Sequence, residues 1–172
     1  DIAIADDNGV TQQVGDQRAR GFELEVAAQP QRNWHVLGSY AYLNAELTRF
    51  SEVIFVPTAE GFVPQVFDRS GNEPAFAPQH LLNLWTARDV AAFTVSAGVR
   101  YVGSQFIAED NAYEIDGVAL VDLGIAYRLG KNTLRLNIKN LTGAKYETRG
   151  FGTASVIPAT PRSFTLGVHC SL

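Results

Sequence analysis

The stretch that decides the fold is Phe93-Thr-Val-Ser-Ala-Gly-Val-Arg-Tyr-Val-Gly-Ser104. Apolar side chains occupy its odd positions from Phe93 to Tyr101, and polar or small ones, Arg100 among them, occupy its even positions. Alternation with a period of two puts the two sets on opposite faces of a β-strand, whereas a helix needs a spacing near 3.6. This stretch therefore predicts a strand with one apolar and one polar face.

The same alternation recurs along most of the chain. Clear examples lie at residues 21–29, 119–129, 133–139 and 163–172. Residues 34–47 alternate less cleanly, and residues 81–87 are apolar in both phases, so that either side of this strand could face outward. The pattern predicts seven strands, with the tail of an eighth before Asp6, and no helix-period segment of useful length competes with them.

The connections between these strands alternate in length. Residues 30–33, 89–92 and 130–132 are short, whereas residues 48–79, 105–117 and 142–161 are long and rich in turn-forming residues. Short turns at one end and long loops at the other are typical of a transmembrane β-barrel. The clear strands are about 9 to 12 residues long, close to the ~9–11 that a tilted strand needs to cross a bilayer.

Aromatic and charged residues follow the same division. The apolar faces carry Trp34, Phe93 and Tyr127 near the short turns, and Phe22, Tyr42 and Tyr101 toward the long loops, as two interfacial girdles would. The charges of the clear strands all fall on the polar face, namely Glu23, Glu25, Arg100, Asp122, Arg128, Arg135 and Lys139. On a lipid-facing side at mid-depth, an Arg or Lys would cost about 2–4 kcal/mol. We therefore expect these seven to face a lumen; a soluble antiparallel sheet with one solvated face is the alternative.

Composition excludes several other classes. The chain has 172 residues, a formal net charge of −4 and one cysteine, which excludes a disulfide scaffold and disfavours a nucleic-acid partner. His35, His80 and His169 have no metal-ligand spacing, and no serine lies in a nucleophile motif, so we predict no catalytic residue, metal site or cofactor. Asp6-Asp7-Asn8-Gly9 is interpreted as a loop tip, and the sequon Asn140-Leu-Thr142 as structural.

Six motifs in order resemble one family. They are Arg18-Ala-Arg-Gly-Phe-Glu-Leu-Glu25, Gly38-Ser-Tyr-Ala-Tyr-Leu-Asn-Ala-Glu-Leu-Thr48, Pro78-Gln-His80 followed by Leu84-Trp85, Gly98-Val-Arg-Tyr-Val-Gly-Ser104, Asn137-Ile-Lys-Asn-Leu-Thr-Gly-Ala-Lys-Tyr146, and Pro161-Arg162 followed by Thr165-Leu-Gly-Val168. Each is similar to a segment in the last third of TonB-dependent outer-membrane receptors of the ferric-siderophore type.

The resemblance implies that residues 1–172 are the C-terminal part of an antiparallel transmembrane β-barrel of about 22 strands. It implies a cell outer-membrane location, contact with the lipid bilayer, a ferric siderophore as transported ligand and no enzymatic activity. The TonB complex would act through a plug domain that, like the N-terminal barrel strands, lies outside this sequence. The alternative is a self-contained small outer-membrane barrel that acts as a pore, an adhesion protein or an enzyme, although seven strands is an odd number and bacterial single-chain barrels have even counts.

Ligand contacts are expected in the long loops, because loops on a rigid scaffold carry recognition. Arginine and aromatic side chains suit an anionic chelate through charge and stacking. The candidates are Arg49, Phe67, Tyr146, Arg149 and Phe151. The alternative is that these residues pack against neighbouring loops; likewise, the seven polar-face charges either line the route of the solute or only solvate the lumen.

Overall fold

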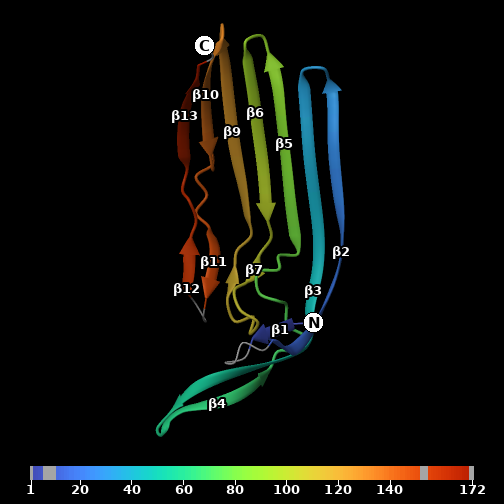
Figure 1. Ribbon diagram of the computed structural model, residues 1–172, viewed down its shortest axis with the longest axis vertical. Coiled ribbons are helices and arrows are strands. Elements are labelled where there is room, and N and C mark those ends of the chain that lie inside the picture. Colours follow the sequence, from blue (N-terminus) through green and yellow to red (C-terminus); the bar gives the residue numbers. More distant parts are fainter. Residues whose placement is uncertain (1, 6–10, 152–154, 171–172) are drawn as a thin grey trace.

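The computed structural model describes residues 2–5, 11–151 and 155–170, and the main feature of this part of the chain is one antiparallel sheet. Its strands lie side by side in the order β1-β2-β3-β5-β6-β9-β10-β13, with β4 paired to the far end of β3 (Figure 1). The strands of this sheet are β1 Ile2–Ala5, β2 Thr11–Gln31, β3 Trp34–Thr58, β4 Gly61–Asp68, β5 His80–Val90, β6 Phe93–Val102, β9 Val118–Leu129, β10 Asn132–Lys139 and β13 Ser163–His169. Two small hairpins pair β7 Gln105–Phe106 with β8 Glu114–Ile115, and β11 Glu147–Phe151 with β12 Ser155–Pro158. No helix in the described residues is long and apolar enough to cross a membrane.

The predicted all-β fold is confirmed. The seven predicted strands correspond to β2, β3, β5, β6, β9, β10 and β13, and β1 is the eighth. The short connections gather at the upper end in Figure 1 and the long ones at the lower end, as the alternating lengths predicted. The interpreted loop tip at residues 6–9 and the last two residues of the predicted final strand lie outside the described residues.

The predicted strand lengths and long loops need correction. β2 and β3 have 21 and 25 residues, and much of the predicted loop 48–79 is a two-stranded ribbon in which Val53 lies opposite Val66 and Phe55 opposite Pro64. The other two predicted long loops contain the β7–β8 and β11–β12 hairpins. A strand alternates between apolar and polar side chains where its two faces meet different environments. A two-stranded ribbon that extends beyond a membrane wall does not separate lipid from lumen, so its side chains need not alternate. The run Val53-Ile-Phe-Val56 is apolar in both phases and gave no strand signal.

Register fixes which side chains share a face. Val95 lies opposite Ile125, Ile125 opposite Leu136, and Leu136 opposite Leu166, so one apolar row crosses four strands. We call this side the apolar face and the other the polar face. Many side chains on the apolar face are exposed, Val95 by 40% and Leu166 by 74%. An exposed apolar surface of this size marks an interaction surface. A lipid bilayer is a partner that would cover the whole apolar face of the sheet.

The pairing of β5 with its neighbouring strands shows which of its side chains lie on the apolar face. Leu82 lies opposite both Tyr40 and Tyr101, which puts the even positions of β5 on the apolar face. Leu81 and Trp85 therefore lie on the polar face. The sequence left this choice open because Leu and Trp occur in both phases.

The predicted aromatic girdles lie at the two ends of the apolar face. At the short-turn end the rings of Phe93 and Tyr127 are 4.7 Å apart between centroids. At the loop end the ring of Tyr42 lies 5.9 Å from that of Phe22 and 5.3 Å from that of His80. Between the belts the apolar face has the character of a membrane-crossing band.

Buried apolar side chains gather at the loop end. Leu47 of β3 is completely buried, and Phe50, Ile107 and Ile115 are each less than 10% exposed. The segment after β4 runs back along β3, where the amide of Gly71 donates to the carbonyl of Leu47. The loops at this end thus form a small packed unit on the wall.

Candidate functional site

The charged residues predicted to face a lumen all lie on the polar face in the register of the sheet. Arg100 lies opposite Leu120, Asp122 opposite Gly98 and Arg135 opposite Gly167. Glu23, Glu25, Arg128 and Lys139 share their parity. The Nζ of Lys139 donates to Oδ2 of Asp122 at 2.8 Å, while the amide of Asn140 donates to Oδ1 at 2.9 Å. The carboxylate of Asp122 thus ties β9 to the end of β10.

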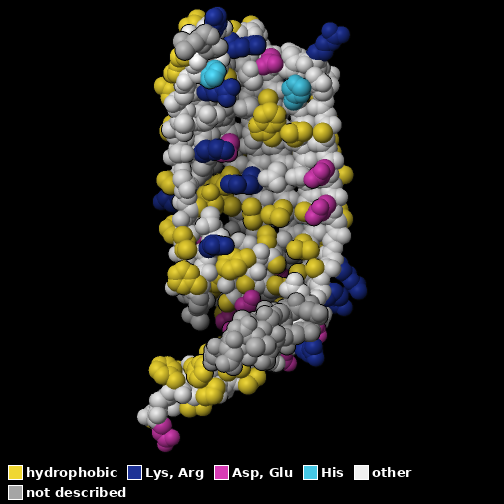
Figure 2. Space-filling view, viewed as in Figure 1, with side chains coloured by type: hydrophobic (Ala, Val, Ile, Leu, Met, Phe, Trp, Pro, Cys, Tyr) yellow, Lys and Arg dark blue, Asp and Glu magenta, His cyan; other side chains and the backbone are white. Residues whose placement is uncertain are grey.

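A groove of about 680 Å³ runs across the middle of this face. Charged Glu25, Arg100 and Asp122 line it together with Leu37 and Trp85, which lie opposite each other on β3 and β5. Figure 2 shows the same mixture, with charged side chains around apolar patches. Leu37 and Trp85 were not predicted as site residues from sequence, because their strands carry apolar side chains in both phases.

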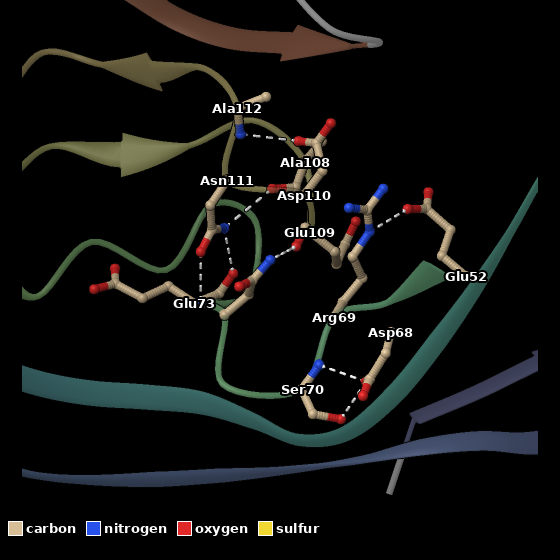
Figure 3. A network of polar contacts seen from close by, with 11 residues as sticks. Glu52, Asp68, Arg69, Ser70, Glu73, Ala108, Glu109, Asp110, Asn111 and Ala112 are labelled. Atoms are coloured by element: carbon tan, nitrogen blue, oxygen red, sulfur yellow. Dashed lines mark hydrogen bonds and ion pairs between the residues drawn. The ribbon is translucent and has the colours of Figure 1, made fainter. Parts of the chain in front are cut away.

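Two loops at the loop end are held together by polar contacts (Figure 3). Oδ1 of Asn111 accepts the amide of Glu73 at 2.8 Å, and Nδ2 of Asn111 donates to the carbonyl of Glu73 at 2.8 Å. Nδ2 of Asn72 donates to the carbonyl of Glu109 at 2.7 Å. We call Asn72, Glu73, Glu109 and Asn111 the loop clamp. Because each bond joins residues 37 or 38 apart in sequence, the clamp links the β4–β5 loop to the β7–β8 hairpin.

The base of the β3–β4 ribbon contains Phe67. The guanidinium of Arg69 lies 5.0 Å from the centroid of its ring, and Nε of Arg69 donates to Glu52 at 3.0 Å. Next to it, the hydroxyl and amide of Ser70 both donate to Asp68, and these two bonds lower the pKa of the Asp68 carboxyl below its usual 3.8. Phe67 is thus already stacked beneath a cation, which limits how much of its ring a ligand can contact.

The β11–β12 hairpin brings together three of the predicted loop candidates. Arg149 and Phe151 are exposed on β11, and Tyr146 lies just before it, half-buried. Beside Tyr146 is a hollow of about 520 Å³ that Lys145 and Arg162 also line. The guanidinium of Arg162 lies where a Cβ on Gly143 would be, so it packs directly over that turn.

Lys145 and Arg162 were not predicted from sequence. They are 17 positions apart and lie in different connections, and only the return of the chain through β12 places both beside Tyr146. Arg162 belongs to the Pro161-Arg162 motif, which was its only sequence signal.

The fifth loop candidate, Arg49, lies elsewhere. It is opposite Asp16 and bonded to that carboxylate at 2.8 Å. Asp16 shares the parity of Arg18 and Phe22 in β2, so Arg49 continues the apolar face rather than the polar face. The structure therefore separates Arg49 from the β11–β12 candidates.

The functional groups of these loops are mainly cationic and aromatic. In residues 2–5, 11–151 and 155–170, no three His, Cys, Asp or Glu side chains are grouped closely enough to hold a metal ion. Guanidinium groups, a lysine and exposed aromatic rings suit an anionic, ring-bearing ligand. A sheet with one apolar and one polar face, aromatic belts at both ends and long loops at one end is typical of the class of transmembrane β-barrel proteins.

Comparison with known proteins gives the family. A family model described as the β-barrel of TonB-dependent receptor-like proteins matches residues 1–141. The chain belongs to the TonB-dependent receptor β-barrel family. Proteins of this family are transport receptors rather than enzymes.

Individual relatives agree with this assignment. The metal-pseudopaline receptor CntO of Pseudomonas aeruginosa is 29% identical over 93% of this chain and 22% of its own length. The ferrichrome outer membrane transporter/phage receptor of Escherichia coli is 29% identical over 81% of this chain and 18% of its own. The crystal structure of the siderophore receptor PiuA from Acinetobacter baumannii superposes with a TM-score of 0.80 at 25% identity, over 96% of this chain and 23% of that one. The chain spans about a fifth of the length of these relatives.

Proposed function

We propose that this chain is the C-terminal part of the barrel wall of an outer-membrane receptor that imports a ferric siderophore in a TonB-dependent manner. The observation that carries the proposal is the two-faced sheet, whose apolar rows suit lipid and whose charged rows suit a wet lumen. The family assignment supports transport as the activity. In this proposal TonB acts through a plug domain outside this sequence.

The ligand contacts of this chain are proposed at the β11–β12 hairpin and the ribbon base. Tyr146, with Lys145 and Arg162 beside it, and the exposed Arg149 and Phe151 of β11 offer cations and rings for an anionic chelate. Phe67 contributes the part of its ring that Arg69 does not cover. Several relatives are named for catecholate, ferrichrome or pseudopaline ligands, so the class of chelate is tested rather than assumed.

The test is uptake of ⁵⁵Fe by cells that lack their own siderophore receptors and express the full-length protein containing this chain. Ferric catecholate, ferric hydroxamate and ferric citrate are supplied separately, with and without a functional TonB. The proposal predicts that cells take up one of the three chelates, and that they do so only when TonB is present. Uptake of none, or uptake independent of TonB, would contradict it.

A pair of variants tests the hairpin. Loss of one charge-assisted contact should weaken chelate binding about tenfold in Arg149→Gln. Arg128→Gln, on the polar face at the opposite end of the wall, serves as the matched control and should bind within about twofold of wild type. Equal binding by both variants would remove the hairpin from the site.

A further inference from the structure

Arg88 departs from the charge pattern in the part of the wall between the short turns and the loop-end aromatic belt. It lies opposite Trp34 and Val95, and therefore on the apolar face. On that face, among the described residues between the short turns and the loop-end belt of Phe22 and Tyr42, it is the only charged side chain. Arg88 belongs to β5, and the sequence did not decide which face of this strand is apolar. Only the pairing of β5 with β3 and β6 assigns Arg88 to the apolar face.

The position of Arg88 in depth explains how the charge is tolerated. It is two residues before the end of β5, beside the first residue of β3, at the short-turn end. A charge on the lipid side costs about 2–4 kcal/mol at the bilayer midplane but only ~0–1 near the interface. At this depth a long arginine side chain reaches the level of the lipid headgroups.

The surroundings of Arg88 form a fixed seat. Nε1 of Trp34 donates to Oγ1 of Thr86 at 2.8 Å, and this hydroxyl donates to the carbonyl of His35 at 3.0 Å, which holds the indole in place. The guanidinium carbon of Arg88 lies 5.7 Å from the ring of Trp34. Nη2 of Arg88 donates to Oε1 of Gln31 at 3.2 Å.

This arrangement leaves the cation with capacity to bind an anion. A guanidinium carries five N–H donors, and the described side chains give it one acceptor, Gln31. The nearest carboxylate in sequence, Asp89, has the opposite parity and lies on the polar face. At the interface of a bilayer the anion within reach is the phosphate of a lipid, whose oxygens match the fork of a guanidinium.

We propose that Arg88, with Trp34 and Gln31, binds the phosphate of a glycerophospholipid in the leaflet at the short-turn end of the wall. Trp34 would lie against the glycerol and first acyl carbons, where indole rings are enriched in membranes. The inference rests on the proposed outer-membrane location, because only then does this face meet lipid. It assigns a lipid site in addition to the transport site.

The experiment measures lipid binding by the purified full-length receptor in detergent, using native mass spectrometry with added palmitoyl-oleoyl phosphatidylglycerol. Arg88→Gln should bind this lipid about tenfold more weakly, the loss of one charge-assisted contact. Arg88→Lys keeps the charge but loses the fork of the guanidinium, so its lipid binding should fall between that of wild type and that of Arg88→Gln. Arg128→Gln removes a charge at the same end on the polar face and should stay within about twofold.

Two further arms identify the chemistry and the source of the phosphate. The diacylglycerol with the same chains but no phosphate should bind wild type and Arg88→Gln equally, and soluble glycerol phosphate should not displace the lipid. Each variant is used only if it shows the heat-dependent gel mobility of a folded barrel.

Equal lipid binding by Arg88→Gln and Arg128→Gln would overturn the assignment. So would a loss in Arg88→Lys as large as in Arg88→Gln, a matching loss with diacylglycerol, or displacement by glycerol phosphate. A receptor without chelate uptake but with Arg88-dependent lipid binding would contradict the proposed transport and leave the lipid site standing.

Discussion

At the scale of single residues, Asn140 shows how one side chain shapes the end of a strand. Its backbone has φ of 51°, a left-handed conformation that most side chains avoid, and its side chain is 4% exposed. Oδ1 accepts the amide of Ala144 at 2.9 Å and Nδ2 donates to the carbonyl of Ala144 at 2.8 Å. The structure thus supports the interpretation of the Asn140 sequon as structural, because this amide is buried and bonded within its own turn.

Replacing Asn140 tests that role. Asn140→Ala removes both side-chain bonds and keeps an unfavourable φ, so the turn should lose about 2–3 kcal/mol of local stability. Limited proteolysis of the full-length receptor should cleave residues 140–162 faster than in wild type. Asn140→Gly also loses the side-chain bonds but adopts this φ without strain, so its cleavage rate should lie between those of wild type and Asn140→Ala. Cleavage of Asn140→Ala at the wild-type rate would show that the turn is held by other contacts.

Adjacent positions on β10 test the two faces. Leu136 lies on the apolar face between Ile125 and Leu166, while Asn137 lies on the polar face between Gly124 and Thr165. Leu136→Arg should cost about 2–4 kcal/mol of unfolding free energy in lipid vesicles, because its charge enters hydrocarbon. Asn137→Arg should cost less than about 0.5 kcal/mol. Urea unfolding of the full-length barrel measures both, and equal costs would be evidence against lipid on that face.

At the scale of elements, alternation predicted the strands that divide two environments and missed those that do not. β6, β9, β10 and β13 were predicted from their own sequences because each has one apolar and one polar row. The β3–β4 ribbon was not, because its run Val53-Ile-Phe-Val56 is apolar in both phases. For β5, Leu81 and Leu82 are equally apolar, and only pairing with Tyr40 decided between them.

The same limit applies to the candidate site. Tyr146, Arg149 and Phe151 could be named from residue type and loop position, and they are close in sequence. Arg162 becomes a neighbour of Tyr146 only through the fold of the hairpin. Arg49 has a suitable side chain, yet its place opposite Asp16 depends on a bulge at Thr48 that residue types do not reveal.

The loop clamp predicts that two loops open together. Asn111→Ala removes the bonds to the backbone of Glu73, so hydrogen exchange should rise about five- to thirtyfold in residues 69–79 and also in 105–115, as expected for about 1–2 kcal/mol. Asp110→Ala removes only the bond to the amide of Ala112 within one loop, and should affect residues 105–115 alone. If Asn111→Ala left residues 69–79 unchanged, the loops would be independent.

At the scale of the whole molecule, the described sheet is open. Its path runs from β1 to β13, and within the described residues these two strands pair with no further strand at their outer edges. Lipid cannot satisfy the backbone N–H and C=O groups of an open edge, and in water such an edge invites pairing with other chains. The wall thus needs further strands of the barrel to complete it.

We therefore expect the isolated 172-residue chain to form no stable monomer. In detergent-free buffer it should associate, and its circular dichroism should show no sharp thermal transition. The full-length receptor in detergent serves as the control and should unfold cooperatively. A monomeric chain with a cooperative melt would mean that the sheet closes or is covered by itself.

The most direct test of the account is a spin-label scan along β6 in the full-length receptor reconstituted in lipid. Single cysteines at residues 93–102, in a background where Cys170 is replaced, carry a nitroxide whose accessibility to oxygen and to a water-soluble nickel complex is measured. The account predicts strict alternation: Val95, Ala97 and Val99 meet oxygen dissolved in lipid, and Ser96, Gly98 and Arg100 meet the nickel complex or are shielded from both. Accessibility to nickel at both sets, or protection of the odd positions from oxygen, would contradict a wall between membrane and lumen.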